Sequence, residues 1–149
     1  MSILQRCREE GIHTAVDTSG WVDIPALEKA LPYTDLLLLD IKGLNGADYE
    51  WITGQKDQKF RWAQRLIQEK KIDLWLRYVV LPGINDSEEH RLKLKELMDN
   101  LSSQVKKIGY LPYHSLGIHK WEKLGLEYSL YSLPSPTQVE MDQFDSIKL

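Results

Sequence analysis

Hydrophobic residues gather in a few short segments of the chain, and the longest unbroken run of them lies within residues 35–42. This segment reads Asp35-Leu-Leu-Leu-Leu-Asp40-Ile41-Lys42 and shows no alternation of apolar and polar positions. Such a run is typical of a strand that is buried on both faces in a parallel sheet. The sequence therefore predicts a central parallel strand at residues 35–42, with both of its faces covered.

Three further segments have the composition of strands. Residues 12–17 are rich in β-branched side chains, residues 73–81 form an apolar run that Pro82 stops, and residues 107–113 form the last segment. Helical patterns and capping sequences lie between them and at both ends of the chain, at residues 2–10, 23–31, 47–53 and 59–71, after Asp86-Ser-Glu-Glu89, and after Pro136. A Gly-rich loop is expected before Pro134. The alternation predicts an α/β fold whose parallel strands are joined by right-handed crossovers.

Composition narrows the function classes. The chain has 149 residues and a net charge of −3, with acidic and basic residues mixed along it, and it is expected to form one domain, 1–149. A nucleic-acid or membrane-surface role needs clustered positive charge, which is not seen. The single cysteine, Cys7, cannot form an internal disulfide or build a zinc or iron–sulfur site by itself. The cytoplasm is the expected location.

The predicted strands carry polar side chains toward their carboxyl ends: Asp17 and Thr18 on the first, Asp40 and Lys42 on the second, Arg77 within the third and His114 at the end of the fourth. In a repeat of strand and helix units, the carboxyl ends of all the parallel strands lie at the same end of the sheet, and ligands bind at that end. Asp17 could instead cap a turn, and Arg77 could pair with a structural carboxylate.

Histidines elsewhere have plain structural explanations. His90 is expected on the solvent-facing surface of its helix, and a lone His114 could be a loop residue without a task. The combination of complementary polar residues at four successive strand ends is the stronger signal.

Four segments resemble the pyruvate formate-lyase activating enzymes, which are glycyl-radical-enzyme activases of the radical S-adenosylmethionine superfamily. The resemblance covers nearly the whole chain in order and spacing, through Gly11-Ile-His-Thr-Ala-Val-Asp17-Thr18-Ser-Gly20, Leu39-Asp40-Ile41-Lys42, Trp75-Leu-Arg77-Tyr-Val-Val-Leu-Pro82-Gly83 and Leu111-Pro-Tyr-His114-Ser-Leu-Gly117-Ile-His119-Lys120-Trp121.

The resemblance implies a fold and a chemistry. The family folds as an incomplete (β/α)6 barrel, of which this chain would form about four parallel βα units. A [4Fe-4S] cluster on a Cys-x3-Cys-x2-Cys loop holds S-adenosylmethionine. Reductive cleavage then gives a 5′-deoxyadenosyl radical, which takes a hydrogen atom from a glycine of the partner, pyruvate formate-lyase.

The resemblance also assigns residues. Asp40, Ile41 and Lys42 would line the S-adenosylmethionine site, His114 would contact the same ligand from the last strand, and Arg77 would lie on the same rim. A monovalent cation would be held by oxygens of four residues, namely Asp17, Thr18, Asp40 and the carbonyl of Leu38. Hard oxygen ligands suit an alkali cation.

The chain departs from the family pattern in lacking the Cys-x3-Cys-x2-Cys loop and an early Gly-Gly-Glu strand end. It is therefore expected to be a C-terminal part of such an enzyme, inactive alone. One alternative is a cluster-less module that binds a nucleotide-like ligand or a glycyl-radical enzyme without catalysis. A half-barrel for sugar phosphates ranks last, since no Gly-rich phosphate loop supports it. Strand 12–17 would be an open edge, which predicts either self-association, through this strand or by a swap of the first helix, or a chain of only marginal stability.

Overall fold

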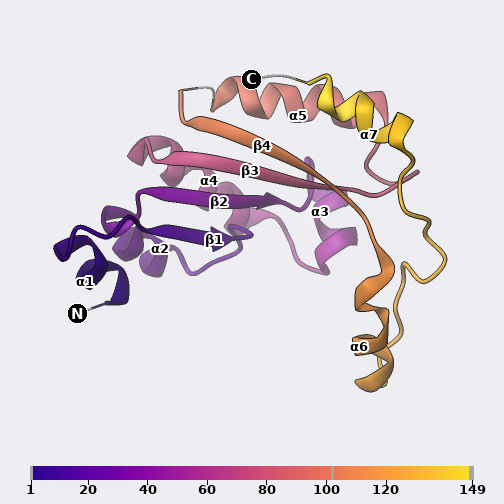
Figure 1. The fold of residues 1–149 in the computed structure, drawn as a ribbon, viewed down its shortest axis with the longest axis horizontal. Helices are drawn as coiled ribbons and strands as arrows, with labels where there is room; N and C mark the ends of the chain where they lie inside the picture. The colour runs from indigo at the N-terminus through magenta and orange to yellow at the C-terminus, as the bar shows by residue number, and fades with distance from the viewer. Residues whose placement is uncertain (1, 102, 148–149) are drawn as a thin grey trace.

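The computed structural model describes residues 2–101 and 103–147. Within them, four parallel strands form one sheet in the order β1-β2-β3-β4 (Figure 1). Their bounds are Ala15–Thr18 for β1, Leu36–Ile41 for β2, Asp73–Val80 for β3 and Val105–Pro112 for β4. The predicted α/β fold with parallel strands is thus confirmed, and the strand bounds differ from the predicted ones by up to three residues.

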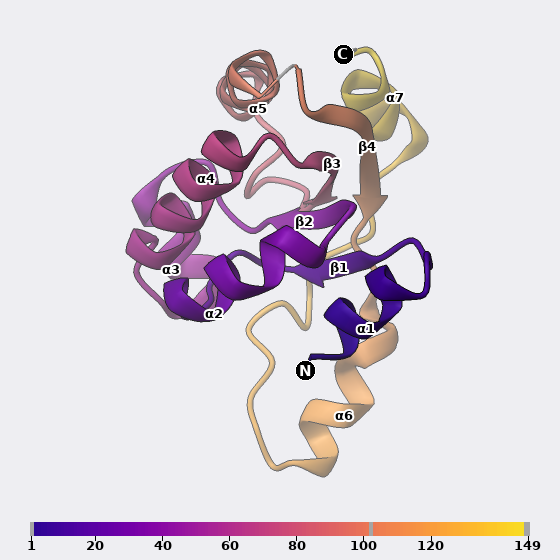
Figure 2. The same ribbon diagram turned by 90° about the vertical axis from the view of Figure 1, so that its left-hand side faces the viewer.

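Helices lie between the strands and at both ends of the chain. They are α1 (Ile3–Glu9), α2 (Ile24–Ala30), α3 (Gly46–Thr53), α4 (Gln58–Lys70), α5 (Glu88–Asn100), α6 (Ile118–Lys123) and α7 (Gln138–Asp145), with short 3-10 turns at Leu31–Tyr33 and Ser115–Gly117. Seen along the strands, α2, α4 and α5 lie on one side of the sheet (Figure 2). The helix α6 lies where the sequence predicted only a loop.

The first strand begins three residues later than predicted, because residues 12–14 are held by the turn after α1 and by the side chains around Thr14, and Ile12 N donates to the carbonyl of Cys7 at 2.8 Å. Thr14 N donates to Asp35 Oδ2 at 2.8 Å, and Thr14 Oγ1 donates to the carbonyl of Tyr33 at 2.6 Å. Ile12 remains 57% exposed. A β-branched composition alone does not distinguish a segment held in this way from a strand.

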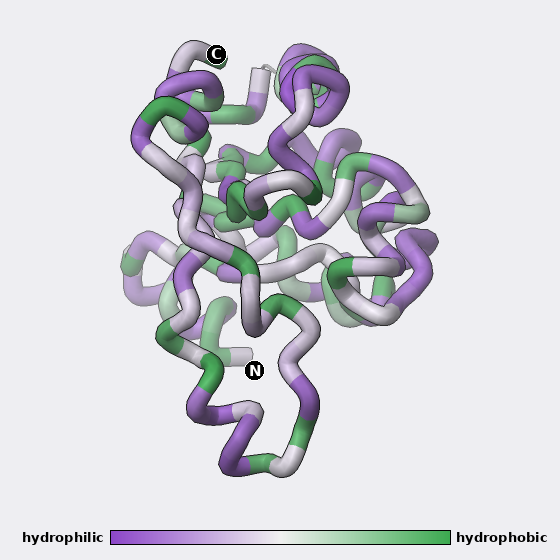
Figure 3. Tube along the Cα trace, turned by 90° about the vertical axis from the view of Figure 1, so that its right-hand side faces the viewer, coloured by the Kyte–Doolittle hydropathy of each residue, from purple (hydrophilic) through white to green (hydrophobic). Residues whose placement is uncertain are grey.

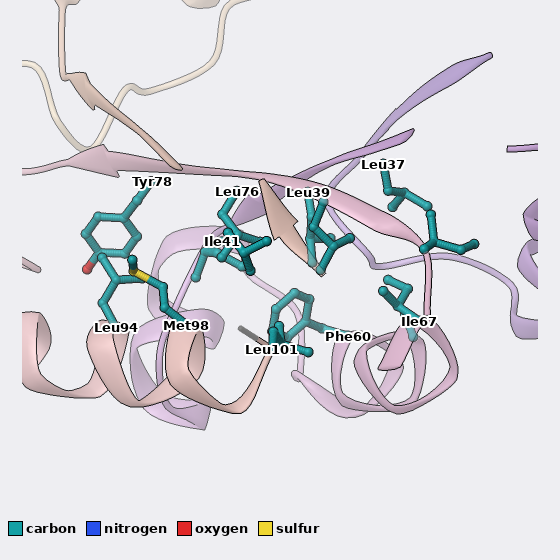
Figure 4. Close-up of a cluster of buried hydrophobic side chains, with 14 of the residues drawn as sticks. Leu37, Leu39, Ile41, Phe60, Ile67, Leu76, Tyr78, Leu94, Met98 and Leu101 are labelled. Atoms are coloured by element: carbon teal, nitrogen blue, oxygen red, sulfur yellow. The ribbon is translucent and has the colours of Figure 1, made fainter. Parts of the chain in front are cut away.

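Within residues 2–101 and 103–147, helices cover only one face of the sheet (Figure 2). On β2, Leu37, Leu39 and Ile41 are at most 3% exposed, and Figure 4 shows them pointing toward the helices. Their alternate neighbours Leu36 and Leu38 are half-buried on the other face. The prediction that both faces of the central strand are covered is therefore wrong. We call this second face the open face.

The two edges of the sheet differ. Helix α7 packs beside β4, where the Tyr110 hydroxyl donates to the carbonyl of Ile147 at 3.2 Å and the rings of Tyr110 and Phe144 lie 5.5 Å apart. At the other end, β1 pairs with β2 alone among the residues that the structure describes. The β1 edge is therefore the open edge, as the sequence predicted for its first strand.

Residues 114–133, here called the arm, project away from the sheet around α6 (Figures 1 and 2). Tyr113 fixes the base of the arm, since its hydroxyl lies 3.0 Å from that of Tyr128 and donates to the carbonyl of Leu130 at 3.1 Å. Figure 3 shows hydrophobic stretches along the arm, where Leu116 is 75% exposed.

Among the helices that the structure describes, none is long and apolar enough to cross a membrane.

The α5 helix is tied to α3 by a contact that the sequence did not predict. His90 Nε2 lies 3.1 Å from Asp48 Oδ2, and the His90 side chain is only 15% exposed. The expectation that His90 faces solvent is therefore wrong. Ser87, not Asp86, is the N-cap of α5, and its hydroxyl accepts from the backbone N–H of His90.

Candidate functional site

Charged side chains from three neighbouring strands meet on the open face, at the carboxyl end of the sheet. Asp40 is directly opposite Arg77 in the pairing of β2 with β3, and Asp17 is opposite Leu38 in the pairing of β1 with β2. Side chains alternate between the faces of a strand, so Asp40 lies opposite in direction to the buried Leu39 and Ile41. The βα repeat thus brings together residues that are 60 positions apart in the chain.

These residues form a continuous ion-pair network, here called the charge cluster, made of Asp17, Asp40, Lys42 and Arg77. Arg77 Nε donates to Asp40 Oδ1 at 2.6 Å, and Arg77 Nη2 donates to Asp17 Oδ1. Lys42 Nζ lies 3.1 Å from Asp40 Oδ2. Arg77 therefore bridges two strands, and both oxygens of Asp40 are engaged by cationic groups.

The charge cluster is partly shielded from solvent. The side chains of Asp40 and Arg77 are 23% and 28% exposed, whereas that of Asp17 is 59% exposed. Burial opposes the charge on Arg77, but the hydrogen bonds to Asp40 and Asp17 and their negative charge outweigh it, so the pKa of the guanidinium is raised. Arg77 is a permanent cation in this setting.

Two glycines shape the backbone around the charge cluster. Gly43 follows Lys42 and packs so closely on α3 that an added Cβ would lie 2.5 Å from the backbone nitrogen of Tyr49. Gly20 closes the turn after β1 with a positive φ of 72°, and its N–H donates to Thr18 Oγ1 at 3.0 Å. A larger residue at Gly43 would therefore push the chain after β2 away from α3.

The other predicted site residues lie at different depths. Ile41 is 3% exposed and belongs to the core, so only its backbone is available to a ligand on the open face. His114 is exposed directly beyond β4, at the same end of the sheet. Within the described residues, no hydrogen bond joins His114 to the charge cluster, and Thr18 uses its hydroxyl in the turn to Gly20.

Sequence reasoning missed part of the lining of this face. Trp75 and Val79 share the face of Arg77 on β3, and the ammonium of Lys107 lies 4.9 Å from the centre of the Trp75 ring. Gly109 stands opposite Arg77 on β4 and leaves open space there. The sequence could have indicated Trp75 and Val79, because side chains two positions apart on a strand lie on the same face and these residues are two positions from Arg77.

The open face carries the kinds of group that a zwitterionic ligand requires. A carboxylate, two cations and a half-exposed Trp75 could meet the amine, the carboxylate and an apolar ring of such a ligand. A [4Fe-4S] cluster does not fit the residues of this chain, since iron–sulfur clusters need several thiolates and the chain has Cys7 alone. No group of three or more histidine, cysteine or carboxylate side chains suited to a metal ion occurs in the described parts of the chain.

Comparison with known proteins identifies relatives over most of the chain. The chain is 41% identical over 130 residues to the pyruvate formate-lyase-activating enzyme of Clostridium pasteurianum, covering 87% of this chain and 54% of that protein. It is 35% identical over 143 residues to the pyruvate formate-lyase 1-activating enzyme of Escherichia coli K12, covering 95% of this chain and 58% of that protein. This chain is a homologue of the pyruvate formate-lyase-activating enzymes.

The homology is confined to part of those enzymes, because the chain spans about half the length of the curated relatives it matches. No protein-family model matches the chain. The relation confirms the resemblance seen in the sequence, and the activity of the longer enzymes is not thereby assigned to this chain.

Two solved structures share the fold. A domain of the pyruvate-formate lyase-activating enzyme from Bacteroides vulgatus ATCC 8482 superposes with a TM-score of 0.76 and 22% identity, covering 97% of this chain and 80% of that one. A radical SAM methyltransferase from Sphaerobacter thermophilus gives a TM-score of 0.65 at 16% identity, covering 93% of this chain and 38% of that one. At these identities the likeness establishes the α/β fold alone.

Proposed function

We propose that this chain is the part of a pyruvate formate-lyase-activating enzyme that binds S-adenosylmethionine on the open face of its sheet. The observation that carries the proposal is the charge cluster at the carboxyl ends of parallel strands, in a chain 41% identical to such an enzyme. In that family the [4Fe-4S] cluster and S-adenosylmethionine together generate a glycyl radical on the partner enzyme. We assign no such step to this chain, because it cannot hold the cluster.

Binding would exchange internal ion pairs for pairs with the ligand. Lys42 is 34% exposed and bonds to Asp40 by one contact, so it can turn to a ligand carboxylate while Asp40 accepts from the ligand amine. The backbone of Ile41, with Arg77 and His114, would line the same ligand. Without a metal anchor the affinity should be weak, on the order of millimolar, which corresponds to about 4 kcal/mol.

Titration with S-adenosylmethionine, followed by amide NMR shifts, tests the proposal. Shifts are expected at Asp40 to Lys42, Arg77 and His114, and Asp40→Ala should abolish them. Asp73→Ala is the matched control, because Asp73 pairs with Lys106 at 3.3 Å near the opposite end of the same sheet. Unchanged binding in Asp40→Ala would remove the charge cluster from the site.

The partner would be a glycyl-radical enzyme, with pyruvate formate-lyase favoured by the names of the relatives, and the location would be the cytoplasm. A second candidate is a cluster-less module that holds a nucleotide-like ligand or the partner without catalysis, which the single Cys7 favours. A binding assay against pyruvate formate-lyase, combined with detection of the glycyl radical, distinguishes the two candidate functions. Capture without radical formation, even when a cluster-bearing segment of a relative is supplied in trans, identifies the second candidate.

A further inference from the structure

We propose that His90 is a positioning residue for the charge cluster, because it fixes the connection between β2 and α3 that carries Lys42. Among the described residues, no hydrogen bond or ion pair joins His90 itself to the charge cluster. It acts instead from α5 through Asp48, which lies in the first turn of α3. The effect of His90 on S-adenosylmethionine rests on the proposed function, whereas its effect on the connection does not.

The connection after β2 is packed tightly against the start of α3. Asn45 caps the helix, since its Oδ1 accepts from Asp48 N at 2.9 Å and its Nδ2 donates to Asp48 Oδ2 at 2.6 Å. Gly43 lies against the same turn, because a Cβ built there would be 2.5 Å from the backbone nitrogen of Tyr49. A displacement of the first turn of α3 would therefore be passed on to Lys42.

His90 holds this turn from the neighbouring helix. Its Nε2 lies 3.1 Å from Asp48 Oδ2, and the two side chains are 15% and 24% exposed. An ionised carboxylate only accepts hydrogen bonds, so Nε2 is the donor. The other ring nitrogen, Nδ1, lies 2.6 Å from Ser87 Oγ and in the neutral ring accepts from that hydroxyl. Both nitrogens are engaged, and the orientation of the ring is thus set from the N-cap of α5.

Native-state amide hydrogen exchange without any ligand tests the proposal. His90→Phe retains a ring but loses the donor, so the N–H of Asp48 should exchange faster and the amide signal of Lys42 should shift. His90→Gln keeps a donor and should restore the wild-type pattern. Leu97→Ala is the matched control, because Leu97 lies on the same helix beside α4 and its loss should leave both signals unchanged.

Titration with S-adenosylmethionine separates this inference from the proposed function. His90→Phe should weaken the wild-type affinity by on the order of threefold, because a smaller fraction of the chains has Lys42 in place. His90→Gln and Leu97→Ala should bind as the wild type does. A wild type that binds no S-adenosylmethionine contradicts the proposed function, and the exchange measurement then decides the role of His90 alone.

Two results would overturn the proposal in a folded His90→Phe variant. One is wild-type exchange at Asp48, and the other is wild-type affinity in a protein that does bind S-adenosylmethionine. Ring nitrogen NMR of the unmodified protein keeps the test decisive if the variant does not fold. The neutral ring of His90 should carry its proton on Nε2, and a proton on Nδ1 would overturn the proposal as well.

Discussion

Asp40 and Arg77 stand directly opposite each other on neighbouring parallel strands, and Arg77 Nε donates to Asp40 Oδ1 at 2.6 Å. The sequence left two roles open for Arg77, pairing with a structural carboxylate or facing a ligand. The structure shows the pairing, and it places the pair on the open face where a ligand has access. The two roles are therefore compatible at this position.

Removing Asp40 should destabilise the protein more than removing Asp17. Asp40→Ala leaves two cations, Arg77 and Lys42, without their shared partner in a partly buried place, at a cost of about 1–2 kcal/mol. Asp17 is 59% exposed, and its loss should cost less than about 1 kcal/mol. Urea unfolding of both alanine variants measures the difference, with Asp73→Ala as the exposed control. Equal costs for Asp40 and Asp17 would contradict this ranking.

Because helices cover one face of the sheet, alanine substitutions at neighbouring leucines of β2 should lower the free energy of unfolding by unequal amounts. Leu39 is fully buried, so Leu39→Ala should cost about 2–5 kcal/mol. Leu38 is half-buried on the open face, so Leu38→Ala should cost about 1 kcal/mol, since less apolar surface returns to water. Chemical denaturation of both variants decides the matter. A loss at Leu38 as large as that at Leu39 would mean that the open face is covered in solution.

The same leucines show where sequence reasoning stops. The run from Leu36 to Leu39 identified a parallel strand, and the rule that strand ends share one edge brought Asp17, Asp40 and Arg77 together. Four identical residues, however, carry no sign of which face has helices over it. That depends on the connections α2, α4 and α5, which all lie on one side.

Two other features lay beyond the sequence pattern for physical reasons. Helix α6 has six residues, none of them buried, and its two apolar residues, Ile118 and Trp121, are too few to mark a helical face in the sequence. The contact of His90 with Asp48 joins positions 42 residues apart, and a helical pattern around His90 contains no information about that partner. Both features depend on tertiary placement.

The stability of the protein should depend on pH because of Asp35. The backbone N–H of Thr14 donates to the Asp35 carboxyl, and the Thr14 hydroxyl shares its one proton between this carboxyl, at 3.1 Å, and the carbonyl of Tyr33. These hydrogen bonds hold the pKa of the Asp35 carboxyl below its ordinary value. A lowered pKa stabilises the folded state above the unfolded-state pKa, and this contribution is lost as the pH falls through the folded-state pKa. Asp35→Asn should therefore be less stable than the wild type at pH 7.

Urea midpoints measured from pH 7 down to about pH 3 check this expectation. The gap between the wild type and Asp35→Asn should narrow below about pH 4. Thr14→Ser is the control, because it retains both donors to Asp35 and should follow the wild-type curve. A gap that stays constant over the whole range would show that the Asp35 charge does not contribute.

Anaerobic reconstitution with iron and sulfide should load no [4Fe-4S] cluster onto this chain. Cys7 offers one thiolate, and a cluster needs several. Under reduction, no 5′-deoxyadenosine should form from S-adenosylmethionine. Metal analysis, the visible absorption band of the cluster and chromatography of the products measure the three quantities. Stoichiometric iron with a cluster band, or 5′-deoxyadenosine above a Cys7→Ser control, would refute the expectation.

The open edge at β1 should make the chain self-associate. Strand β1 pairs with β2 on one side only among the described residues, and its Ala15 and Asp17 are exposed. An uncovered edge is a template for another strand, and two copies related by a two-fold axis are the commonest ordered outcome. Ala15→Lys places a charge on this edge and should shift the equilibrium toward monomer.

Light scattering over a concentration series measures this shift, with Gln55→Lys in the exposed loop after α3 as a control of equal charge. A wild-type chain that stays monomeric at high concentration with a high unfolding midpoint would show that β1 needs no partner, and an unchanged dimer in Ala15→Lys would place the contact elsewhere.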